Sequence, residues 1–123
     1  MIDHNSYEKD NETNWLNFDH ADLNEELVNY YRGLIKLRKK HPVFRHSDKN
    51  DVQFIESKRK CALGVLLNKA SSGDENDFVV LLNANKRRKA KFKIPDGEWQ
   101  VIADEHRVYE QPQRLVTKAK VTL

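Results

Sequence analysis

Residues 23–42, LNEELVNYYRGLIKLRKKHP, form the stretch that decides the fold. Apolar side chains recur here at spacings of four and three residues, which places them on one face of a helix. That face is formed by Leu23, Leu27, Tyr30, Leu34 and Leu37, and Val28, Tyr31 and Ile35 widen it. A helix with so broad an apolar face has to pack against a barrel, a sheet or a neighbouring subunit.

Both ends of this helix carry recognisable signals. Asp22 is the expected N-cap, and Glu25 three positions later completes a pattern resembling a capping box. Pro42 stops the helix, and His41 before it is expected to interact with the last carbonyl groups. The sequence therefore predicts one long amphipathic helix that ends close to residue 41.

The pattern after residue 45 changes to short apolar runs and period-two alternation, which are typical of strands. Pro95-Asp96-Gly97 has the composition of a tight turn. One last strand is expected to carry its apolar side chains on a single face. The expected strand segments are 52–55, 62–67, 78–82, 92–94, 99–103 and 115–123, the last with Leu115, Thr117, Ala119, Val121 and Leu123 on that face. The fold class predicted is mainly β: an antiparallel β-sandwich preceded by the long helix and by an ordered N-terminal loop over residues 1–18.

The bulk composition limits the classes of function. The chain has 123 residues, of which 38% are hydrophobic and 33% charged, and a formal charge of +3. Acids and bases alternate along the chain, which argues against a nucleic-acid partner. No apolar stretch is long enough to span a membrane, so no membrane partner is expected. Cys61 stands alone, which excludes an internal disulfide, and its apolar neighbours predict a buried core residue.

Residues 29–45, NYYRGLIKLRKKHPVFR, resemble the last barrel helix of pullulanases and related debranching enzymes of the α-amylase superfamily (glycoside hydrolase family 13). In these enzymes this helix reads Tyr-Tyr-x-Gly-Leu-Ile-x-Leu-Arg-x-x-His-Pro-x-Phe-Arg. The segments 5–7, 10–12 and 15–18 resemble the loop that follows the eighth barrel strand of pullulanase- and isoamylase-type enzymes, although Asn17-Phe18 stands where members often have Asp-Trp. Segments 78–84 and 94–99 resemble two strands of the family's C-terminal β-domain.

This resemblance implies two parts. Residues 1–45 correspond to the tail of a (β/α)8 barrel, and residues 46–123 to a C-terminal β-sandwich domain. The partner implied is the catalytic barrel of a parent enzyme that hydrolyses α-1,6 links in α-glucans. The family's catalytic acids come from earlier barrel strands, so no catalytic residue is expected in this chain, and the chain alone is expected to be inactive.

Three residues of the N-terminal loop are candidates for contact with sugar in an intact enzyme: Tyr7, Asp10 and Asn14. The resemblance places them at the rim of the barrel, where the loops after the strands assemble the active site. Their role there would be binding and not bond cleavage. The plainer interpretation of the acids in this region is solvation of a loop.

Other conspicuous residues have structural interpretations. Trp15 and Trp99 fit core packing better than stacking on sugar rings, and the basic run 86–89 fits a solvated turn. The five histidines and Cys61 have no metal-ligand spacing, so neither a metal nor a cofactor is expected.

Two further functions remain open at this stage. One is a stand-alone glucan-binding β-sandwich, and the other is a structural domain that forms a homodimer through the exposed helix face. The compartment is also open between cytoplasmic and secreted, because a signal would lie upstream of the barrel.

Overall fold

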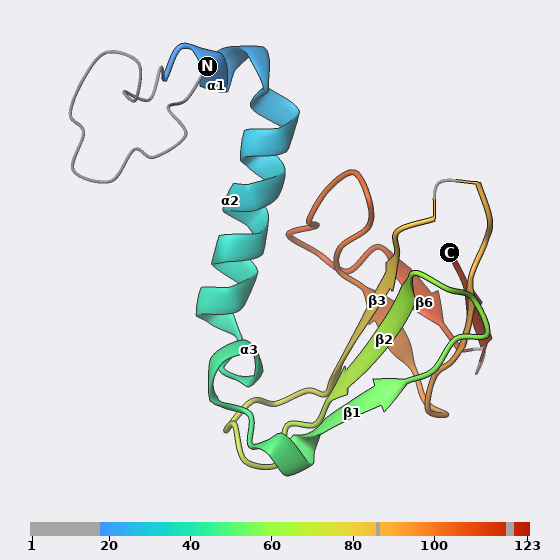
Figure 1. Cartoon of the computed structure of the whole chain (residues 1–123). Coiled ribbons are helices and arrows are strands. Elements are labelled where there is room, and N and C mark those ends of the chain that lie inside the picture. Colours follow the sequence, from blue (N-terminus) through green and yellow to red (C-terminus); the bar gives the residue numbers. More distant parts are fainter. Residues whose placement is uncertain (1–17, 86, 118–119) are drawn as a thin grey trace, which may run out of the picture.

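A computed structural model describes residues 18–85, 87–117 and 120–123 of the chain. Its helices come first and its strands second (Figure 1). The elements are α1 (His20–Leu23), α2 (Glu25–Lys40), α3 (Val43–His46), the 3-10 turn η1 (Lys49–Asp51), β1 (Val52–Ile55), β2 (Ala62–Leu67), β3 (Phe78–Asn83), β4 (Lys91–Lys93), β5 (Trp99–Val101), β6 (Arg114–Val116) and β7 (Lys120–Thr122). The predicted fold class is confirmed: a mainly antiparallel β structure preceded by a long helix. The predicted N-terminal loop falls almost entirely on residues outside the described part.

Three strands form the largest sheet, in the order β1-β2-β3, and all of its pairs are antiparallel. Val65 lies opposite both Phe54 and Val80 in this register. The predicted strands 52–55 and 62–67 are found with the same bounds, because their apolar runs are bounded by turns on both sides. The third strand, predicted over 78–82, extends to Asn83.

The remaining strands form two nested antiparallel pairs, β4 with β7 and β5 with β6. The buried core includes Ala90, Phe92 and Ile94 around β4 and Val43 at the start of α3. The period-two alternation predicted for β4 is confirmed, since Phe92 is buried between the exposed Lys91 and Lys93. Gly97 has a φ of 148° in the predicted turn, a region that favours glycine.

The single last strand predicted over 115–123 is wrong. β6 pairs with β5, and β7 pairs with β4 in another sheet. Leu115 lies opposite Gln100 and is exposed, while Val116 lies opposite the half-buried Trp99. A period-two pattern cannot show that a strand is interrupted and continued in a second sheet, because the pairing partners are set by tertiary structure.

Two local predictions are also corrected. Asp22 is not the N-cap of the long helix, since it lies inside α1. Asn24 separates the two helices, with φ −122° and ψ 35°, and its side chain donates to the carbonyl of His20 at 2.9 Å. Cys61 is exposed and not buried: it adopts a φ of 62° in the turn between β1 and β2, and the strand begins only at Ala62.

Candidate functional site

The apolar side chains of α2 lie on two sides of the helix, one partly covered and one exposed. Val28, Tyr30, Leu34 and Leu37 are partly covered. Leu27, Tyr31 and Ile35 are 56%, 59% and 52% exposed, and Leu23 just before them is 81% exposed. Leu27, Tyr31 and Ile35, spaced by four, form one continuous stripe along α2. We call them the exposed stripe.

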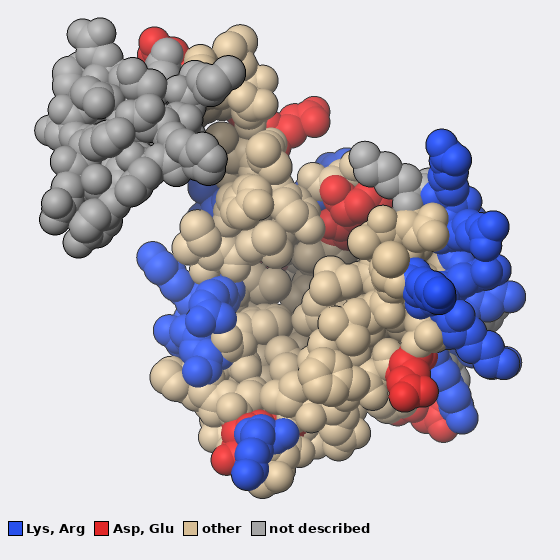
Figure 2. Space-filling model, viewed as in Figure 1, with Lys and Arg blue, Asp and Glu red and all other residues tan. Residues whose placement is uncertain are grey.

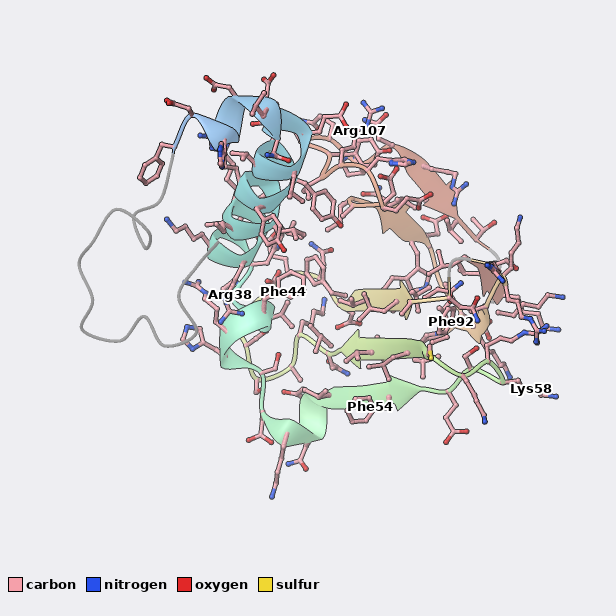
Figure 3. All side chains as sticks on the ribbon, turned by 45° about the horizontal axis from the view of Figure 1, so that its top comes forward. Arg38, Phe44, Phe54, Lys58, Phe92 and Arg107 are labelled. Carbon is pink, nitrogen blue, oxygen red and sulfur yellow. The ribbon has the colours of Figure 1, made fainter. Side chains whose placement is uncertain are left out.

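The covered side of α2 is fitted to a loop of the β-domain. A Cβ atom added at Gly33 would lie 2.7 Å from the Cβ atom of Val108, closer than such atoms approach. Glycine at position 33 therefore allows the helix to approach the segment that carries Val108. This loop lies beside α2 in Figure 3, where Arg107 is labelled.

The loop that carries Val108 is braced by one carboxylate. Ala103 and Val108 form an antiparallel bridge, and Asp104 accepts backbone hydrogen bonds from His106 at 2.9 Å and Arg107 at 3.0 Å. The Tyr109 hydroxyl also donates to Asp104, and this bond with the two backbone bonds lowers the pKa of Asp104 to about 2. The same bond raises the pKa of Tyr109. An ionised Asp104 thus holds the turn that faces Gly33.

The C-terminal end of α2 is anchored on β3. The His41 ring lies 4.6 Å from the Phe78 ring at an interplanar angle of 58°, and the Phe44 ring lies 4.9 Å from Phe78, measured between centroids. Nδ1 of His41 lies 3.3 Å from Oδ1 of Asp74, and the Val43 amide donates to Oδ2 at 3.4 Å. His41 meets a last helical carbonyl as predicted, but through its backbone: its amide donates to the Leu37 carbonyl at 3.0 Å, while its ring faces Asp74. The Arg45 guanidinium donates to the Lys39 carbonyl at 3.3 Å.

Asp74 is the most constrained carboxylate of this anchor, with a side chain only 4% exposed. Burial by itself raises its pKa, but hydrogen bonds from His41 and from the amides of Val43 and Asn76 outweigh burial and lower the pKa below 3.8. Sequence reasoning missed this residue because it lies in a Ser/Gly/Asp-rich loop without periodicity. Its only signal was polarity, which is common to surface loops.

The described residues do not reveal a reaction centre. Tyr7, Asp10 and Asn14 fall outside the described part of the chain, as does Trp15. Trp99 is half-buried, and its ring N–H donates to the Pro95 carbonyl at 3.0 Å, which fits its predicted structural role. Within residues 18–85, 87–117 and 120–123, no group of three His, Cys, Asp or Glu side chains is placed to hold a metal ion. No described helix is both long and apolar enough to span a bilayer.

Comparison with known proteins supports the resemblance seen in the sequence. The family model "Pullulanase, all-beta domain" matches residues 49–107. The pullulanase of Bacillus subtilis (strain 168) is 26% identical over 115 residues, which cover 90% of this chain. These matches support a pullulanase-type C-terminal region of the α-amylase superfamily.

The fold of the chain has a close counterpart in a solved structure. A pullulanase from Bacillus acidopullulyticus superposes on 98% of the chain with a TM-score of 0.84 at 22% identity. The chain spans only 15% of that protein and 16% of the Bacillus subtilis pullulanase. Most of each relative therefore has no counterpart in this chain.

The contact between Gly33 and Val108 predicts that one substitution at Gly33 changes stability in opposite directions in two backgrounds. Gly33→Ala is expected to destabilise the otherwise unchanged chain by about 1–3 kcal/mol, because the added methyl group overlaps Val108. In the Val108→Gly chain, which lacks the Cβ atom that the added methyl group would meet, the same change is expected to stabilise, because alanine favours helix by about 1 kcal/mol over glycine. Urea unfolding of the four chains measures both effects. An effect of Gly33→Ala that is identical in the two backgrounds contradicts the close approach.

The lowered pKa of Asp74 gives a prediction of pH dependence. The ionised Asp74 stabilises the fold fully above pH 3.8, the ordinary pKa of an aspartate. This stabilisation is lost as the pH falls through the lower pKa of the folded state. Asp74→Asn is expected to lower the free energy of unfolding by about 1–3 kcal/mol at neutral pH. The difference between the two chains should shrink in acid, as measured by urea midpoints from neutral pH downward. A difference that stays constant with pH would show that the charge of Asp74 has no role.

Proposed function

We propose that this chain is the non-catalytic C-terminal part of a pullulanase-like glycosidase that hydrolyses α-1,6 links in α-glucans, and that it stabilises the catalytic barrel. Residues 1–45 would complete the barrel with its last helix, and residues 46–123 would form the sandwich attached to it. The single observation that carries this proposal is the exposed stripe of α2.

The energetics of the stripe support a docking role. Full burial of a large aliphatic side chain stabilises by about 1.5–3 kcal/mol. Leu27, Tyr31 and Ile35 together therefore offer enough apolar surface to hold a helix against a partner. Because the opposite side of α2 is fixed by Gly33 and by the His41–Asp74 anchor, the helix does not need to reorganise on docking.

The N-terminal candidates fit the same proposal. In an intact enzyme Tyr7, Asp10 and Asn14 would lie on the loop before this helix, at the end of the barrel where the substrate binds. We propose that they contact glucose hydroxyl groups there. The covalent chemistry would be performed by acids of the barrel that this chain does not supply.

The exposed stripe can be tested by mixing. The partner is the Bacillus subtilis pullulanase shortened by the segment that this chain matches. The unchanged chain is expected to bind it, and Leu27→Glu/Ile35→Glu is expected to weaken binding at least about tenfold, because two charges would enter an apolar interface. Gln53→Glu/Gln100→Glu, which adds the same charge at exposed strand positions, is the matched control and should bind as the unchanged chain does. Isothermal titration calorimetry measures the affinity, and circular dichroism confirms the fold of each variant.

The alternatives give different outcomes. Affinity of the isolated chain for maltodextrin would favour a glucan-binding module, with the open cleft of about 390 Å³ beside Phe54 as its site. Concentration-dependent self-association that Leu27→Glu/Ile35→Glu abolishes, without binding to the barrel, would favour a dimer. Release of reducing ends from pullulan by the purified chain would contradict a non-catalytic role.

A further inference from the structure

The side of the molecule turned away from α2 carries a dense group of cations (Figure 2). All of its described members are exposed, and they come from two turns and two strands far apart in the sequence. We call this group the cationic side: Lys58, Arg59, Lys60, Arg87, Arg88, Lys89, Lys91, Lys93 and Lys120. Cations and acids alternate along most of the chain, but the fold gathers these cations on one side.

Hydrogen bonds hold the parts of the cationic side together. The Ser57 hydroxyl at the first turn donates to the Lys91 carbonyl at 3.2 Å. The Ala84 amide, before the second turn, donates to the Cys61 carbonyl at 2.9 Å. The Asn83 side chain donates to the Arg88 carbonyl at 3.0 Å. The two basic turns are therefore fixed next to one another and to β4, so their charges are held in place before any partner arrives.

No salt bridge to the cationic side is found among the described residues. Segments 57–61, 84–93 and 120–123 contain no Asp or Glu. Lys93 and Lys120 lie directly opposite each other in the β4–β7 pair, an arrangement of like charges that destabilises a sheet. Both salt bridges found among the described residues involve histidines elsewhere, His41 with Asp74 and His106 with Glu105. An anionic partner would relieve this repulsion.

The neighbouring side chains indicate which anion fits. The aromatic residue in these segments, Phe92, is buried, so bases or sugar rings have no platform for stacking there. Leu63 and Leu82 lie opposite each other next to the two turns and are exposed, as is Leu123 at the end of β7. A hydrated polyanion makes no use of exposed leucines. A lipid surface binds both kinds of side chain: the cations contact its phosphates, and the apolar side chains enter its interface.

We propose that the cationic side binds the surface of an anionic lipid bilayer. Such binding is peripheral, so it needs no membrane-spanning segment, and the expectation of no membrane partner rested on the absence of one. Lys58 lies at the far end of the molecule from α2 in Figure 3, so the exposed stripe stays free for a protein partner when the bilayer is bound. The inference does not depend on the proposed function.

The test uses the full chain and sedimentation with vesicles. Vesicles of phosphatidylcholine with about 30% phosphatidylglycerol are expected to bind the chain, and vesicles of phosphatidylcholine alone are not. Binding should weaken when salt is raised well above about 0.1 M. Arg87→Ala/Arg88→Ala is expected to weaken the partition about thirtyfold, or about fivefold for each cation removed. Arg32→Ala/Lys36→Ala removes the same charge from α2 and should leave the partition within about twofold.

A third variant distinguishes binding to lipid from binding to other polyanions. Leu63→Ser/Leu82→Ser is expected to weaken vesicle binding several-fold and to leave any binding of duplex DNA unchanged. The proposal is overturned if the chain does not bind the anionic vesicles. It is also overturned if the two double alanine variants lose vesicle binding to the same extent. It is also overturned if duplex DNA binds more tightly than the vesicles and the serine variant retains full vesicle binding.

Discussion

The structure depends on a helix that is apolar on two sides and covered by its own chain on only one. On the covered side, Gly33 meets Val108 at a distance that no larger residue permits without a shift. On the other side, Leu27, Tyr31 and Ile35 face solvent. A lone amphipathic helix needs one apolar face, so the second face is apolar surface left exposed to solvent. The sandwich supplies a rigid support for it, through the rings of His41, Phe44 and Phe78 and through the Asp74 carboxylate.

Periodicity predicted the helix and the three-stranded sheet well, because each is a long segment with one dominant repeat. The breadth of the apolar face led to the expectation that α2 packs against a barrel, a sheet or a neighbouring subunit, and a partner outside this chain stays a prediction. The division of that face into a covered and an exposed part was not predictable, because it depends on where the loop around Val108 returns. The helix boundary was misjudged for a related reason: Asp22 and Glu25 have suitable spacing, but Asn24 separates them into two helices.

The other differences between sequence and structure have the same origin in non-local contacts. Cys61 has apolar neighbours and is still exposed, because the chain reverses at that residue with a positive φ. The 115–123 pattern looks continuous, although its two halves pair with β5 and β4. The small net charge of the chain did not indicate the cationic side, because turns about 30 residues apart along the chain come together only in the fold. Tyr7, Asp10 and Asn14 stay predictions.

Helix α2 and the cationic side lie on opposite sides of the described structure (Figures 1 and 2). The central claim concerns the exposed stripe of α2. Its most direct test is hydroxyl-radical footprinting of Leu27, Tyr31 and Ile35, first in the monomeric chain and then after the chain is joined to a pullulanase barrel. The account predicts high reactivity in the monomer and strong protection in the joined protein. Protection already present in the monomer would show that the chain covers this helix by itself, and the central claim would be wrong.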